Sequence, residues 1–158
     1  MLKILFVCHG NICRSPMAEF IFKDMVKKEG LAESFSIASA ATSTEEIGNH
    51  IYPPAKRELT KNGVPFDSAK CARQMTKSDY DRYDYLIGMD RMNLRNMERI
   101  AGKREKLFQL LSFAGEDRDV ADPWYTDNFT EAYEDILRGC KAFLKYLRKQ
   151  GEIGNPGK

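Results

Sequence analysis

The sequence is poor in the residues that build metal sites and disulfide frameworks. Its 158 residues include only four cysteines and two histidines, and no two cysteines stand in a C-x-x-C arrangement. A zinc site would therefore need scattered ligands. A domain of this length buries roughly two-thirds of its unfolded surface and needs neither a metal nor disulfides to fold. We expect no metal, no cofactor, and cysteines that remain thiols.

Long apolar runs and a strong net charge are also missing. No stretch approaches the roughly 18 apolar residues of a membrane span, and the apolar start of the chain is too short for a signal peptide. Lysine and arginine number 25 against 23 acidic residues, which gives a formal net charge of +2. Such a balance does not favour a nucleic-acid partner. We expect a cytoplasmic protein that binds neither membrane nor nucleic acid.

What the sequence does contain is an alternation of short apolar runs and helical periodicity. Strands are predicted at residues 3–7, 35–40, 85–89 and 106–111, and helices at residues 16–29, 54–62, 91–101 and 130–147. Ser15 is the predicted N-cap of the first helix, with Pro16 in its first position. The alternation implies a small α/β domain with a parallel sheet, whose ligands bind beyond the carboxyl ends of the strands.

The composition shifts only at the end of the chain. Residues 151–158, GEIGNPGK, form the one stretch rich in glycine and proline. Such a segment is typical of a flexible C-terminal tail. We therefore expect a single domain over residues 1–150, followed by a tail over residues 151–158.

The residues most suggestive of chemistry lie between the first predicted strand and the first helix. Cys8 closes the strand, and Arg14 follows six residues later in the loop, just before a helix N-terminus. Such a loop can turn its N–H groups inward to bind an oxyanion, and Arg14 can hold two phosphate oxygens. The same positive groups favour the thiolate form of Cys8. Together these features indicate a nucleophile for phosphoryl transfer.

The motifs of this chain resemble those of the low-molecular-weight protein tyrosine phosphatases. The segment CHGNICRSPMAEF (8–20) carries the resemblance most strongly. It is extended by SAATS (39–43), EIGN (46–49), ARQMT (72–76), Asp84-Tyr85, Met89-Asp90 with Asn93, and DPWY (122–125). The resemblance implies a four-stranded parallel sheet flanked by helices on both faces, a phosphotyrosine protein phosphatase I-like fold with flavodoxin-like layering. It also implies metal-free hydrolysis of phosphotyrosine in proteins through a phosphocysteine.

The resemblance also assigns roles to individual residues. Cys8 would be the nucleophile, Arg14 the phosphate clamp, and Asp122 the general acid that later acts as a base. The substrate and its phosphate, or another oxyanion, would be bound by His9, Gly10, Asn11, Ile12, Cys13, Ser15, Trp124 and Tyr125.

Other roles implied by the family concern support of the loop. Ser15 would donate a hydrogen bond to the Cys8 thiolate, and Asn11 would hold the loop in its strained shape together with Ser43. Asp90 would brace Arg14.

Two positions depart from the family pattern. Animal members carry an aromatic residue just before the Glu-Ile-Gly-Asn stretch, whereas this sequence has Glu45, so one wall of the ring slot is missing or acidic. Many members place a histidine shortly before the Ala-Arg-Gln stretch, and Lys70 is the nearest counterpart here. We expect a different polar network behind the loop.

Several residues allow a second interpretation. Cys13 is either a packing residue or a disulfide partner that protects Cys8 on oxidation. Asp79 and Asp81 are weaker candidates for the acid, and a solvated face is expected for both. His9 is expected to be an exposed loop residue rather than a base. Further expectations are that Cys71 and Cys140 are buried thiols and that Trp124 and Tyr125 form either core or pocket rim.

Three other functions remain as alternatives. Arsenate reductases of similar fold need a further nearby pair of cysteines, whereas Cys71 and Cys140 are far apart in the sequence. Protein-arginine phosphatases form a branch of the same family that tends to carry threonine in place of Ile12. The third is a catalytically inactive phosphotyrosine-binding module, and the retention of Cys8, Arg14 and Asp122 together argues against it.

Overall fold

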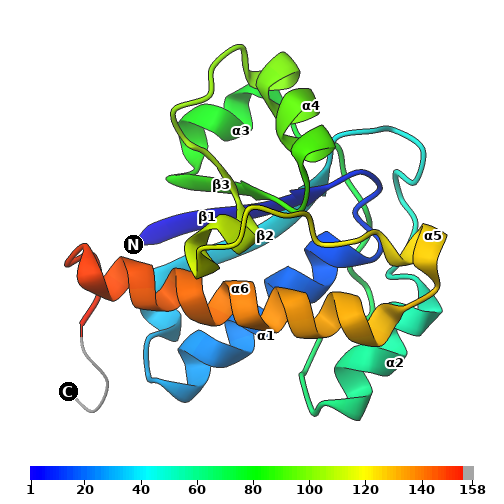
Figure 1. The fold of residues 1–158 in the computed structure, drawn as a ribbon, viewed down its shortest axis with the longest axis horizontal. Helices are drawn as coiled ribbons and strands as arrows, with labels where there is room; N and C mark the ends of the chain where they lie inside the picture. Colours follow the sequence, from blue (N-terminus) through cyan, green and yellow to red (C-terminus); the bar gives the residue numbers. More distant parts are fainter. Residues whose placement is uncertain (155–158) are drawn as a thin grey trace.

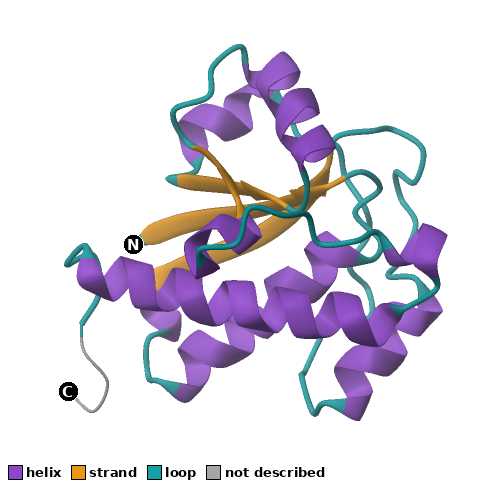
Figure 2. Cartoon of the chain, viewed as in Figure 1, coloured by secondary structure: helices purple, strands orange, loops and turns teal. Residues whose placement is uncertain are grey.

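A four-stranded parallel sheet lies between two layers of helices in the computed structural model, which describes residues 1–154 (Figure 1, Figure 2). The strands are β1 (Leu2–Cys8), β2 (Phe35–Ala41), β3 (Tyr85–Gly88) and β4 (Leu107–Gln109). They stand in the order β2-β1-β3-β4, and each neighbouring pair is parallel. The predicted α/β fold and its four strands are confirmed. Because β1 is central, its carboxyl end lies where the chain order reverses, which is where open α/β sheets bind ligands.

Alternate residues of β1 face two separate cores. Ile4 and Phe6 belong to the core beneath α1 (Arg14–Lys28) and α6 (Phe129–Lys149), against which α2 (Pro53–Lys61) packs. Leu5 and Val7 belong to the smaller core beneath α3 (Lys77–Arg82) and α4 (Arg91–Ala101). All four side chains are fully buried. Burial on both faces explains why β1 reads as a continuous apolar run rather than an alternating one.

The last strand, predicted at residues 106–111, extends too far at its C-terminal end. β4 stops at Gln109, and Leu110 and Leu111 instead enter the 3-10 helix η2 (Leu110–Ala114) with both side chains fully buried. The apolar run alone cannot distinguish a strand from a buried helical turn. The side chain of Leu110 fits against α6 because Gly139 has no Cβ there. A Cβ at Gly139 would lie 2.5 Å from Leu110 Cγ.

Three short helices were not predicted from the sequence, namely α3, the 3-10 helix η1 (Ala32–Ser34) and α5 (Pro123–Thr126). α3 begins with a capping box between Thr76 and Asp79. Asp79 is buried and ion-paired with Arg73 at 2.9 Å, so its expected place on a solvated face is wrong, whereas Asp81 is exposed.

The C-terminal segment is described as far as Gly154, and residues 155–158 of the predicted tail lie outside the described residues. In the described part, Glu152 accepts a hydrogen bond from the hydroxyl of Tyr85, and Ile153 packs against the larger core. None of the helices formed by residues 1–154 has the length and apolar character needed to cross a bilayer.

Candidate active site

Residues 8–14 connect β1 to α1 at the carboxyl edge of the sheet, on the right in Figure 1. The carbonyl of Cys8 accepts a hydrogen bond from Thr42 N at 2.9 Å, and that of His9 accepts one from Ser43 N at 3.1 Å. These bonds continue the pairing of β1 with the chain after β2. They anchor the start of the loop to the sheet.

Asn11 gives the loop its shape. Its φ of 59° lies in the left-handed region, which asparagine tolerates better than most residues. The buried side chain donates from Nδ2 to Ser15 Oγ at 2.8 Å and to Ser39 Oγ at 3.0 Å. Its Oδ1 accepts hydrogen bonds from Lys70 Nζ and from Arg73 N, each at 3.3 Å. Four contacts therefore hold a backbone conformation that costs free energy by itself.

Asn11 and Ser43 both bond to the loop, but the hydrogen-bond partners of the Asn11 side chain are Ser15, Ser39, Lys70 and Arg73 rather than Ser43. Ser43 follows the end of β2, and its hydroxyl donates to the carbonyl of His9 at 2.9 Å. Ser39 is the serine that bonds to Asn11, because it lies within β2 and its side chain points toward α1, where Glu19 accepts a hydrogen bond from its hydroxyl. Neither Ser39 nor Glu19 was predicted from the sequence as a site residue. The single available signal was their presence in the two stretches that resemble the family.

The Cys8 sulfur lies at the floor of the loop and is almost fully buried. It is 3.0 Å from Ser15 Oγ and 3.3 Å from the backbone nitrogen of Asn11, which donates to it. Ser15 does not cap α1 as predicted, because the helix already begins at Arg14 with Cys13 at the N-cap. The hydroxyl of Ser15 faces the sulfur instead.

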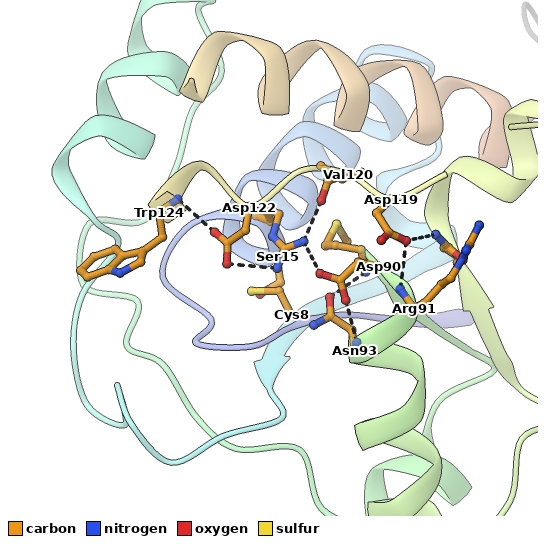
Figure 3. Close-up of polar contacts among 12 residues, drawn as sticks. Cys8, Ser15, Asp90, Arg91, Asn93, Asp119, Val120, Asp122 and Trp124 are labelled. Carbon is orange, nitrogen blue, oxygen red and sulfur yellow. Dashed lines mark hydrogen bonds and ion pairs between the residues drawn. The ribbon is translucent and has the colours of Figure 1, made fainter. Parts of the chain in front are cut away.

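Arg14 is buried and donates hydrogen bonds to three residues, Asp90, Val120 and Asp122, which Figure 3 labels. Its Nη1 donates to Asp90 Oδ2 at 2.7 Å and to the carbonyl of Val120 at 2.8 Å, and its Nη2 donates to Asp122 Oδ2 at 3.4 Å. Burial alone would lower the pKa of Arg14, but the negative groups Cys8, Asp90 and Asp122 outweigh it and raise that pKa. Arg14 is therefore a fixed positive charge at the loop.

Asp122 sits at the N-cap of α5, and its Oδ1 accepts a hydrogen bond from Trp124 N at 3.0 Å. The chain before it is tied down at two points. Val120 N donates to the carbonyl of Met89 at 2.9 Å, and Asp119 Oδ1 accepts from Arg91 N at 3.1 Å, as Figure 3 shows for Asp119. A short, anchored segment thus brings Asp122 to Arg14.

A pocket opens above the Cys8 sulfur. It is lined by Cys8, His9, Gly10, Ile12, Cys13, Arg14, Glu45, Glu46, Asp122, Trp124 and Tyr125. Trp124 and Tyr125 are 54% and 83% exposed, which makes them rim rather than core residues. Glu45 stands on the rim with His9, whose Nε2 is 2.9 Å from Glu45 Oε2. Asp79 and Asp81 do not line this pocket.

The cysteines differ in environment. Cys13 and Cys140 are buried, and burial raises the pKa of both thiols; for Cys13 the nearby Cys8 and Asp122 add to the effect. Cys71 is exposed, so its expected burial is wrong. Its segment forms an isolated bridge with His50 at the surface. Within residues 1–154, no group of three histidine, cysteine or acidic side chains is arranged to hold a metal ion.

Comparison with known proteins gives a consistent result. Residues 3–153 match the family described as low molecular weight phosphotyrosine protein phosphatase. The chain is 39% identical to the low molecular weight protein-tyrosine-phosphatase YfkJ of Bacillus subtilis, over 97% of this chain and 100% of that protein. It is 40% identical to the Gallus gallus low molecular weight phosphotyrosine protein phosphatase, over 90% and 94% of the two chains.

Solved structures agree with these sequence matches. The crystal structure of YfkJ superposes with a TM-score of 0.91 over 95% of this chain and 96% of that chain. The structure of a Drosophila arginine phosphatase, 30% identical, superposes with a TM-score of 0.85 over 93% and 98% of the two chains.

Proposed function

The chain belongs to the low molecular weight phosphotyrosine protein phosphatase family, and from this we propose that it hydrolyses phosphotyrosine in proteins, and small aryl phosphates, through a phosphocysteine on Cys8. The observation that carries the proposal is the convergence of Cys8, Arg14 and Asp122 on one pocket. These are the nucleophile, the anion clamp and the proton carrier that such a reaction needs.

In the first step, the phosphate group binds within the loop. The loop N–H groups and Arg14 hold its oxygens, and the Cys8 thiolate attacks phosphorus from below. The bond from phosphorus to the tyrosyl oxygen breaks while Asp122 gives its proton to that oxygen. The hydroxyl of Ser15, 3.0 Å from the sulfur, stabilises the thiolate before attack.

In the second step, water replaces the departed tyrosine. Asp122, now a carboxylate, takes a proton from the water as its oxygen bonds to phosphorus. The bond between sulfur and phosphorus breaks, inorganic phosphate leaves, and Cys8 returns as a thiolate. No metal is required for either step, because Arg14 supplies the positive charge.

Substitution of the nucleophile tests the proposal. Cys8→Ser should abolish turnover of phosphotyrosine peptides while still binding phosphate or vanadate, because serine is similar in size but is not ionised at neutral pH. Steady-state kinetics and oxyanion binding by calorimetry measure the two properties. Turnover by pure Cys8→Ser protein would refute the role of Cys8.

A second candidate function is hydrolysis of phosphoarginine, because a structural neighbour is named an arginine phosphatase. Ile12 lines the pocket and argues for phosphotyrosine. A guanidinium would be desolvated against its apolar side chain without a hydrogen-bond partner, at a cost of about 1–3 kcal/mol, whereas a phenyl ring loses nothing there. The acidic Glu45 on the rim is the feature that favours the second candidate.

Comparing specificity constants separates the two substrates. We expect a preference for phosphotyrosine of about ten- to a hundredfold, and Ile12→Thr should reduce it by shrinking the side chain and adding a hydroxyl. The measurement is kcat/KM on matched phosphotyrosine and phosphoarginine peptides for both proteins. A preference for phosphoarginine by the unmodified protein would reverse the assignment.

Two finer points belong to the same proposal. We place the enzyme in the cytoplasm, and we expect peroxide to inactivate it reversibly through a disulfide between Cys8 and Cys13, which both lie in the pocket. Cys13 is a protonated thiol at rest, because its pKa is raised, so Cys8 would be oxidised first.

A further inference from the structure

A pair of opposite charges, one buried and one partly buried, lies behind the loop, outside the residues that line the pocket. Glu19 comes from α1 and Lys70 from the segment before the ARQMT stretch. Glu19 Oε1 accepts a hydrogen bond from the hydroxyl of Ser39 at 2.6 Å, and its Oε2 accepts one from Lys23 Nζ at 2.6 Å. Lys70 Nζ lies 3.7 Å from Glu19 Oε1 and donates to Asn11 Oδ1 at 3.3 Å. The pair therefore contacts the residue that shapes the loop.

The donors and acceptors leave only one direction for the hydrogen bonds. A carboxylate cannot donate, so the single hydroxyl proton of Ser39 must go to Glu19. Ser39 Oγ is then an acceptor for Asn11 Nδ2. A lysine cannot accept, so the oxygen of the Asn11 amide must face Lys70. Glu19 and Lys70 thus orient the same amide from its two sides.

The orientation of the Asn11 amide determines whether Cys8 receives a hydrogen bond from Ser15. The second Nδ2 hydrogen of Asn11 goes to Ser15 Oγ at 2.8 Å, so Ser15 accepts from Asn11. The proton of Ser15 is then directed to Cys8 Sγ at 3.0 Å; its other acceptor, the carbonyl of Ala40, is farther away at 3.4 Å. If the amide turned over, its oxygen would face Ser15 and compete with the sulfur for this proton.

We propose that Glu19 and Lys70 are positioning residues that fix the direction of this hydrogen-bond chain and so keep the Ser15 hydroxyl as a donor to the Cys8 thiolate. The inference rests on the proposed role of Cys8 as the nucleophile. It adds that the ionisation of Cys8 depends on two charges that touch neither the sulfur nor the phosphate.

Other charged groups lie at both ends of this chain of hydrogen bonds, near Lys70 and near Cys8. Burial lowers the pKa of Lys70, and Arg73 and Lys23 lower it further against the opposing effect of Glu19. Lys70 therefore loses its proton at lower pH than an exposed lysine, and its support of Asn11 weakens as the solution becomes alkaline.

At the other end, Cys8 is faced by Arg14 from α1, by Cys13 in the loop, and by Asp122 through Arg14. These groups stay the same when Glu19 or Lys70 is replaced. A lower thiolate content in Glu19→Gln then reports on the hydrogen bonds, because the loss of a negative charge would by itself favour the thiolate.

The test is the pH dependence of Cys8 alkylation by iodoacetamide, followed by site-resolved mass spectrometry. Glu19→Gln allows an N–H to face Ser39, so the chain can reverse. Its alkylation profile should move to higher pH, with a rate on the acidic limb of the profile that is threefold to tenfold lower. Lys70→Met should move the profile in the same direction but less, because Arg73 N still donates to Asn11 Oδ1.

Two variants serve as matched controls. Lys23→Met removes a cation from the same carboxylate, but from the oxygen that is not part of the chain, and should leave the profile unchanged. Lys70→Arg keeps a donor that cannot accept, and should restore most of the unmodified profile. Thermal unfolding of each variant separates these effects from loss of fold.

The outcomes are distinguishable. If Glu19→Gln and Lys70→Met keep the unmodified alkylation profile while their melting temperatures fall, the pair is only structural and the inference is wrong. Because the two variants act on different sides of Asn11, either one decides the question if the other does not fold. If the profiles shift as expected but the unmodified protein does not hydrolyse phosphotyrosine, the inference stands and the proposed function fails.

Discussion

At the scale of single residues, the two carboxylates beside Arg14 are not equivalent. Asp90 uses both oxygens, one for Arg14 at 2.7 Å and the other to cap α4 through Asn93 N at 2.7 Å. Asp122 has only a longer contact of 3.4 Å to Arg14 and one backbone hydrogen bond from Trp124 N. Asp122 also lines the pocket, whereas Asp90 does not. The proposed brace, Asp90, and the proposed proton carrier, Asp122, can therefore be distinguished by their contacts.

This difference leads to a prediction for Asp122→Asn. The variant should hydrolyse substrates with basic leaving groups about 10² to 10⁴ times more slowly, and substrates with acidic leaving groups almost normally, because only a basic leaving oxygen needs a proton. The measurement is kcat across a series of aryl phosphates. Asp90→Asn is the control and should slow all of them alike. A uniform loss in Asp122→Asn would mean that the acid lies elsewhere.

At the scale of elements, the fit of α6 against η2 depends on one missing side chain. Gly139 lies within a 21-residue helix, where glycine is normally unfavourable. Its absence of a Cβ allows Leu110 to approach the helix backbone. A residue of low helix propensity is therefore tolerated in α6 because it allows closer packing against η2, the segment that follows β4.

Gly139→Ala should accordingly destabilise the protein. Alanine adds about 0.5–1 kcal/mol of helix propensity, but the clash with Leu110 costs about 1–3 kcal/mol, so we expect a net loss of about 1 kcal/mol. Urea unfolding measures the change. In a Leu110→Ala background the clash is absent, and the same substitution should become neutral or stabilising; an equal loss in both backgrounds would contradict the packing argument.

A second element-scale prediction concerns the capping box of α3. Burial opposes the charged form of Asp79, but hydrogen bonds from Arg73 and Thr76 outweigh it and lower its pKa. A lowered pKa means that the stabilisation is present above the unfolded-state pKa of about 4 and is lost as the pH falls through the folded-state value.

Asp79→Asn should therefore lower the free energy of unfolding by about 1–3 kcal/mol at neutral pH, and by less below about pH 4. Chemical denaturation of the variant and the unmodified protein, at neutral pH and below about pH 4, measures the difference in the free energy of unfolding. The exposed Asp81→Asn is the matched control and should change little at either pH. If the cost of Asp79→Asn were the same at both, the ion pair would not be its cause.

At the scale of the whole molecule, local patterns predicted the elements better than the contacts between them. Apolar runs located all four strands, and the loop from Cys8 to Arg14 is contiguous, so its chemistry could be read from spacing. Val120 and Asp122 lie 106 and 108 residues beyond Arg14, and no spacing rule joins them to it.

The errors have the same origin. Ser39 and Ser43 are both plausible partners for Asn11 in the sequence, and only the register of β2 against β1 selects Ser39. Lys70 departs from the family pattern in the sequence, but its contact with Asn11 depends on how the segment before α3 crosses the sheet edge. Such choices are made by tertiary packing and leave no periodic signal in the chain.

The positions of the two ends of the described chain, at the edge of the sheet opposite the pocket, have a consequence for fusion and immobilisation. Met1 lies at the amino edge of the sheet, and the contact of Glu152 with Tyr85, the first residue of β3, brings the last described residues to the same edge (Figure 1). The pocket opens at the opposite edge. A fusion partner or a solid support joined at Met1 or after Gly154 would therefore face away from the loop between Cys8 and Arg14, so an immobilised form should keep its pocket open to large phosphoproteins.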